Sequence, residues 1–87
     1  MGSVYVDDCF LSDTRTMMLI RRLGHKESIG LCVLIVKLYN SVGPTITPKM
    51  IQMAYSAKYY AILIDIGFII ETLDGLVLEI PGMGWEE

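Results

Sequence analysis

The chain has 87 residues, enough for one domain around one hydrophobic core. Hydrophobic residues make up 53% of it, so either the core is unusually apolar or apolar surface is left for a partner. The longest uncharged apolar run, residues 29–36, is far shorter than the roughly 20 residues of a membrane span, and the acidic start of the chain does not resemble a signal peptide. Two cysteines are too few for a disulfide scaffold, which favours a reduced, cytoplasmic protein.

Charge is distributed unevenly along the chain, although the net charge is only −3. Every lysine and arginine lies within residues 14–60, where Glu27 is the only acidic residue, and both flanking segments lack basic residues. Such segregation favours a basic face on an acidic domain, which is the footprint of a nucleic-acid binder. The alternative is a set of ordinary solvated helix faces.

The N-terminal region predicts a short strand and a helix. Residues 4–6 are β-prone, and we expect an edge strand that pairs with the hairpin described below. A helix follows over 13–23 with Gly24 as its stop, and its N-cap is Ser12 or Asp13. The apolar positions of this helix recur at helical spacing and are Met17, Leu19, Ile20 and Leu23.

A second, longer helix is predicted from Lys26 to about Ser41. Nearly all of its positions are apolar, which predicts a helix buried in the middle of the domain. Its β-branched residues leave a buried strand as the alternative, although the segment is longer than most strands. Residues 40–44 are expected to form a loop, and residues 45–46 a short strand.

Residues 47–67 predict a helix-turn-helix. Thr47 is a good N-cap with Pro48 at the first helical position, and Ser56 caps a second helix that ends at Gly67. The expected core positions of the second helix are Tyr60 and Leu63, and its opposite stripe is Lys58, Ala61 and Asp65.

A β-hairpin is predicted directly after this motif. Residues 68–71 and 76–80 are apolar β-type runs, and Asp74-Gly75 between them is a strong hairpin signal. This order of elements predicts an α+β, mainly α fold: a winged helix-turn-helix with a C-terminal β-hairpin wing over about 68–80. We expect residues 1–87 to be a single domain cut from a longer protein, since the chain stops directly after the wing.

The sequence does not indicate enzymatic chemistry. It has no phosphate-binding glycine loop, its acidic residues lack metal-loop spacing, and His25 is expected to be a surface or capping residue. Cys9 and Cys32 are expected to be core thiols. We therefore predict no enzyme, no cofactor and no metal site. The methionines at core spacing are Met17, Met50 and Met53.

A winged helix favours binding to double-stranded DNA. The second helix of such a motif enters the major groove with its N-terminal residues nearest the bases. The predicted DNA-binding residues are Ser56, Lys58 and Tyr59 in that helix, Lys49 on phosphate, and Arg15, Arg21, Arg22 and Lys26 from earlier in the chain. Acidic residues of the wing, Glu71 and Asp74, would repel a phosphate backbone.

A protein-interaction or oligomerisation module is the alternative interpretation of the same fold. One helical stripe cannot bury all the isoleucines of the second motif helix, so at least one is expected to face a second subunit or the N-terminal strand. The predicted interface residues are Ile62, Ile64, Ile66, Val4 and Tyr5.

Positions along nearly the whole chain also carry a family resemblance. They are Phe10 and Asp13 at the start, Ile20, Arg21, Leu23 and Gly24 in the first helix, Leu34, Leu38 and Tyr39 in the second, and Gly67, Phe68 and Ile69 at the wing entry. This pattern resembles the N-terminal domain of phage replisome-organiser and replication-initiation proteins, and is similar to that of DnaD-type primosome proteins.

The resemblance implies a domain in the bacterial host cytoplasm or nucleoid that binds origin DNA and forms homo-oligomers. It further implies recruitment of a replicative helicase or helicase loader, with no membrane partner. A module that binds a replication partner or itself without DNA, and a transcriptional repressor, are the alternatives.

Overall fold

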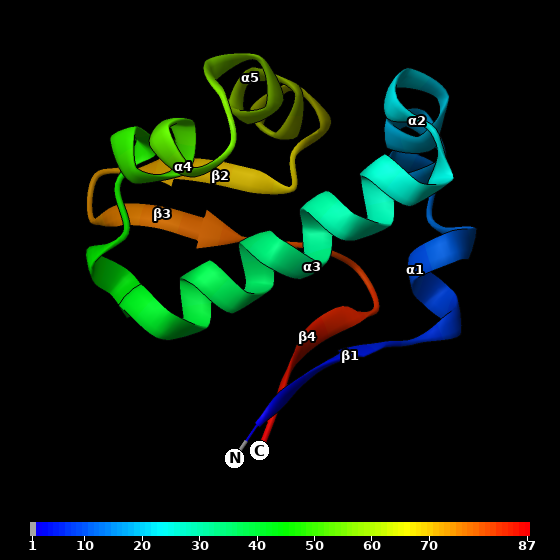
Figure 1. Ribbon diagram of the computed structural model, residues 1–87, viewed down its shortest axis with the longest axis horizontal. Coiled ribbons are helices and arrows are strands. Elements are labelled where there is room, and N and C mark those ends of the chain that lie inside the picture. Colours follow the sequence, from blue (N-terminus) through cyan, green and yellow to red (C-terminus); the bar gives the residue numbers. More distant parts are fainter. Residues whose placement is uncertain (1) are drawn as a thin grey trace.

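Residues 2–87, the part of the chain that the structure describes, form an α+β fold that is mainly helical (Figure 1). In this computed structural model the helices are α1 (Asp8–Ser12), α2 (Thr14–Leu23), α3 (His25–Val42), the 3-10 turn η1 (Gly43–Thr45), α4 (Pro48–Ala54) and α5 (Ala57–Ile66). The strands are β1 (Ser3–Val6), β2 (Ile69–Thr72), β3 (Gly75–Leu78) and β4 (Met83–Glu86). In Figure 1, α3 runs diagonally between the β1–β4 pair and the group formed by α4, α5 and the β2–β3 hairpin.

The helix predicted over 13–23 is α2, and local signals fix both of its ends. Asp13 accepts a hydrogen bond from the Arg15 N–H at 2.9 Å. Gly24 follows the helix with φ 87° and ψ 168°, and its N–H closes the last turn on the Ile20 carbonyl at 2.7 Å. The predicted helix and its glycine stop are confirmed, and Asp13 is the N-cap.

The short helix α1 has no predicted counterpart. Asp7 caps it by accepting a hydrogen bond from the Cys9 N–H at 3.4 Å. Its single turn carries Phe10 into the core, where that side chain is fully buried. Five residues show no usable helical periodicity, so the sequence pattern could not reveal this turn.

The long helix α3 confirms the helical interpretation of residues 26–41 and excludes the strand. It begins at His25 and continues to Val42, so most of the predicted loop over 40–44 is helical. Its buried residues lie on one side and are Ser28, Leu31, Cys32, Ile35 and Val36. Leu34 on the other side is 49% exposed, so the helix lies between the other elements (Figure 1) but is not buried on every side.

The strand predicted over residues 45–46 is also wrong. Gly43–Thr45 forms η1, in which the Ile46 N–H donates to the Gly43 carbonyl at 3.1 Å. Thr45 donates its hydroxyl hydrogen to the Val42 carbonyl at 2.9 Å. These local bonds use the backbone in a turn, and Ile46 enters the core from it.

The helix pair α4 and α5 confirms the predicted caps. Thr47 Oγ1 accepts from the Met50 N–H at 3.2 Å, and Ser56 Oγ accepts from the Tyr59 N–H at 3.1 Å. Gly67 ends α5 in the left-handed conformation, with φ 92° and ψ 15°. The expected core residues Tyr60 and Leu63 are buried, and the expected outer stripe of Lys58, Ala61 and Asp65 is exposed.

The predicted hairpin is present, but its turn lies one residue earlier than expected. Thr72 pairs with Gly75, so the two-residue connection is Leu73-Asp74 rather than Asp74-Gly75. Gly75 opens β3 with φ 132°, a value that favours glycine, and in the described range only glycines have φ in this positive, left-handed region. The glycine is therefore needed directly after the turn, not inside it.

The N-terminal strand is present with a different partner. β1 pairs antiparallel with β4, with Val4 opposite Trp85 and Tyr5 opposite Gly84, so the predicted pairing with the wing is wrong. A Cβ at Gly84 would lie 2.9 Å from the Tyr5 hydroxyl oxygen, which explains the glycine in a strand. β4 was not predicted, because Pro81 and Gly82 resemble the end of the folded segment.

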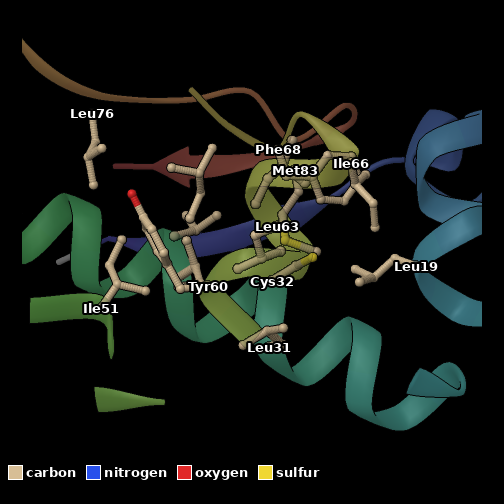
Figure 2. Close-up of a cluster of buried hydrophobic side chains, with 14 of the residues drawn as sticks. Leu19, Leu31, Cys32, Ile51, Tyr60, Leu63, Ile66, Phe68, Leu76 and Met83 are labelled. Atoms are coloured by element: carbon tan, nitrogen blue, oxygen red, sulfur yellow. The ribbon is translucent and has the colours of Figure 1, made fainter. Parts of the chain in front are cut away.

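A single core joins the elements (Figure 2). Figure 2 shows side chains from α2, α3, α4, α5, β3 and β4 converging, among them Leu19, Cys32, Ile51, Leu63 and Met83. Two predictions about this core are wrong: Cys9 is exposed, and the three methionines expected in the core, Met17, Met50 and Met53, are 51%, 41% and 79% exposed. Cys32 is buried as predicted.

Candidate nucleic-acid interface

The first turn of α5 carries the only basic residue of that helix, Lys58. Lys58 is exposed on the outer stripe of the helix. Ser56 is half-buried, and its hydroxyl oxygen is occupied as the N-cap acceptor. Of the residues predicted at this turn, Lys58 is therefore the one that offers a free-standing charge to a phosphate.

Tyr59 joins this turn of α5 to the first turn of α3. Its hydroxyl donates a hydrogen bond to Glu27 Oε2 at 3.0 Å. That hydrogen bond, and then the negative charge of Glu27, raise the pKa of the Tyr59 phenol. The predicted DNA-binding tyrosine is thus held against α3 by a protein contact.

A groove of about 280 Å³ lies between α3 and the α4–α5 turn. It is lined by Lys26, Glu27, Gly30, Leu31, Leu34, Tyr55 and Tyr59. Burial raises the pKa of the Tyr55 phenol. The groove brings the exposed Lys26 next to the first turn of α5, a proximity that spacing in the sequence does not reveal.

Two of the predicted DNA-binding arginines have protein partners. Arg15 contacts Asp13 at 3.4 Å, donates to the Gly67 carbonyl at 3.4 Å and lies over the Phe68 ring at 5.5 Å. It therefore ties α2 to the start of the hairpin, and its assignment as a DNA contact stays a prediction.

The pairing of Arg22 differs because its acidic partner, Asp65, is more exposed than Asp13. Arg22 Nη2 lies 2.7 Å from Asp65 Oδ2, and both side chains are largely accessible to water. Arg21 and Lys49, the remaining predicted contacts, are exposed on α2 and α4. The basic residues are thus spread over four helices; Lys26 lines the groove, and Lys58 is exposed on the first turn of α5, next to the groove residue Tyr59 in sequence.

The predicted protein-interface residues divide by burial. Ile66 lies in the core with 6% exposure, so its side chain offers little surface to a partner. Ile62 and Ile64 are half-buried against the core, as is Val4. Tyr5 is 44% exposed on β1.

A larger cavity of about 500 Å³ lies between α3, β4 and the segment that follows β3. Arg15, Tyr39, Asn40, Glu79 and Trp85 are among the residues that line it. Spacing along the chain does not reveal this cavity, because half of its wall is β4 and the residues just before that strand.

The described range lacks both clusters of metal-ligating side chains and membrane-spanning helices. Residues 2–87 contain no group of three or more histidine, cysteine, aspartate or glutamate side chains that could hold a metal ion. Within the same range, none of the helices has the length and apolar character that crossing a membrane requires.

Comparisons of the chain with protein-family models, with curated proteins and with solved structures gave no match. The function must therefore be argued from the residues and their geometry.

Proposed function

We propose that this chain is a winged helix-turn-helix that binds duplex DNA, as the DNA-binding domain of a phage-type replication-initiation protein. The observation that carries the proposal is the exposed first turn of α5, within the succession α4, α5, β2 and β3. Lys58 belongs to that turn, and Lys26 lines the groove beside it. The family resemblance described above supports the same function.

Phosphate is attracted to this end of α5 by two kinds of charge. The first N–H groups of a ten-residue helix carry about half a positive charge, and Ser56 occupies only one of them. Lys58 and Lys26 add full charges on exposed side chains. Recognition helices contact DNA with this end, where side chains reach base edges and backbone.

The hairpin contributes little to this contact. Glu71 and Asp74 are exposed carboxylates on the wing, which repel phosphate. We therefore infer a footprint centred on α5 and the start of α3, with Arg21 and Lys49 on flanking phosphates.

Fluorescence anisotropy of a labelled duplex tests the proposal. Lys58→Glu is expected to weaken binding about tenfold, and wild-type affinity should fall steeply with salt because phosphate contacts release counterions. Lys37→Glu is the matched control, because it makes the same charge change outside the expected contact. Lys37 lies about 16 Å along α3 from Lys26, the α3 residue expected to contact DNA. No binding at low salt, or equal losses for the two variants, contradicts the proposal.

Exposed apolar side chains support a second role, in self-association or in docking a helicase or helicase loader. Leu11, Met17 and Met18 are 51%, 51% and 43% exposed, on α1 and α2. Apolar surface of this kind marks protein contacts when it is contiguous. Light scattering tests the self-association, and a strict monomer at high concentration contradicts it. A transcriptional repressor would use the same α5 contact and differ in the DNA that it binds.

A further inference from the structure

The groove between α3 and the α4–α5 turn contains a glycine that packing does not explain. Gly30 lies in the interior of the eighteen-residue helix α3, where glycine costs about 1 kcal/mol relative to alanine. A Cβ added at Gly30 would meet no atom within 4 Å, and the backbone there has no positive φ. Neither steric crowding nor backbone conformation requires a glycine at position 30. The structural consequence of Gly30 is the open space that it leaves in the groove.

That open space forms a slot on one face of α3. Lys26, Gly30 and Leu34 are spaced four residues apart and therefore lie in one row along the helix. The missing side chain at Gly30 leaves a gap between the Lys26 ammonium and the 49% exposed Leu34 side chain. Across the groove the wall consists of Tyr55 and Tyr59.

The chemistry of the slot matches one nucleotide. A volume of about 280 Å³ is at the lower end of ligand-binding pockets, the size of a single planar group rather than a peptide segment. Aromatic rings and an aliphatic floor suit the face of a base, and a lysine at the rim suits its phosphate. Glu27, whose Oε2 accepts the Tyr59 hydrogen bond, adds a carboxylate acceptor for an N–H group on the base edge, such as N3–H of thymine.

We propose that this groove binds an unstacked base of single-stranded DNA, with Tyr55 and Tyr59 against the base and Lys26 on the adjacent phosphate. The inference rests on the proposed function, since it adds a single-strand site beside the duplex contact of Lys58. A paired base cannot enter such a slot, because both of its faces are covered by stacking in the duplex.

Gly30→Leu tests the groove, with Gly30→Ala as its matched control. Leucine fills the slot, whereas alanine adds one methyl group and leaves the slot open. Both residues are better helix formers than glycine, so both variants should fold. We expect Gly30→Leu to weaken binding of a labelled oligothymidine by about 5- to 150-fold, the range of one stacked base, and to leave duplex affinity within about twofold. Gly30→Ala should leave both affinities within about twofold.

The outcomes separate this inference from the duplex proposal. Binding of duplex but not of oligothymidine by the wild-type protein overturns the inference alone, and binding of neither overturns both. Unchanged oligothymidine affinity in Gly30→Leu also overturns it, and is the result expected if the groove receives a side chain of a protein partner. Tyr55→Ala should reproduce the loss for oligothymidine while leaving the duplex affinity unchanged.

Discussion

The hydroxyl of Tyr59 lies 3.0 Å from Glu27 Oε2 and donates a hydrogen bond to it, joining the first turn of α5 to the first turn of α3. This contact closes one side of the groove and fixes the tyrosine ring within it. It also makes the ionisation of Tyr59 depend on Glu27.

Glu27→Gln is expected to lower the pKa of Tyr59 towards the ordinary value of a phenol, since the hydrogen bond to a carboxylate and its charge are what raise it. A raised folded-state pKa stabilises the fold below the ordinary phenol pKa, and that contribution is lost as the pH rises through the folded value. NMR titration of the tyrosine rings measures this. Tyr55 is the internal control, because burial raises its pKa; equal shifts of both tyrosines would contradict the account.

The two glycines of the α2–α3 region should respond oppositely to alanine. Gly30→Ala is expected to stabilise the protein by about 1 kcal/mol, because the helical backbone there accepts a Cβ and nothing crowds it. Gly24→Ala is expected to cost about 1–3 kcal/mol, because φ 87° and ψ 168° form a conformation that only glycine adopts readily. Urea denaturation of both variants measures the pair, and effects of the same sign would refute this explanation.

Phe68 should be among the most sensitive core positions. The side chain is fully buried beneath the Arg15 guanidinium, so Phe68→Ala is expected to cost about 3–5 kcal/mol. Leu73→Ala is the control at the fully exposed tip of the same hairpin, with an expected change within about 0.5 kcal/mol. Thermal denaturation followed by circular dichroism compares the two, and similar losses would show that the hairpin packs differently.

Asp65→Asn should increase the affinity for duplex DNA. Asp65 holds Arg22 at 2.7 Å on the exposed face of α5, so the change removes a negative charge and releases a positive one. An exposed pair is weak, and we expect about a two- to fivefold gain at low salt. Glu86→Gln makes the same charge change on β4 and should leave affinity unchanged; a gain in Asp65→Asn no larger than in Glu86→Gln would place the DNA on another face.

The two cysteines should differ in reactivity towards a thiol reagent. Burial raises the pKa of Cys32 from 9.0 to about 12, so this thiol stays neutral and shielded in the folded protein. Cys9 is exposed and should react first. Cys32 should react with a second equivalent of the thiol reagent only when the protein unfolds. Because the folded-state pKa of Cys32 is raised, its contribution to stability is complete below about pH 9 and is lost between pH 9 and 12. Rapid labelling of both thiols at neutral pH would contradict the burial of Cys32.

Local signals predicted the elements well. Thr47, Ser56 and Gly67 act where the sequence placed them, because a cap or a glycine stop is decided by a few neighbouring residues. The predicted position of the hairpin turn was wrong by one residue. Asp74 lies in the turn, but Gly75 is already the first residue of β3.

Contacts between distant residues were not predictable in the same way. β4 has a glycine in a four-residue strand and becomes a strand only by pairing with β1 across most of the chain. The charge pattern indicated Arg15 as a DNA contact, although tertiary packing directs it onto Phe68. Similarly, nothing in the spacing of Lys26 and Tyr59 predicts that they line one groove.

The central claim is that duplex DNA contacts the first turn of α5. Titration of the isotopically labelled protein with a short duplex, followed by amide NMR shifts, tests it most directly. The account predicts the largest shifts at residues 56–59 and around Lys26, reversed by added salt. Shifts confined to α1 and α2 around Leu11 and Met18, or none at low salt, would contradict it.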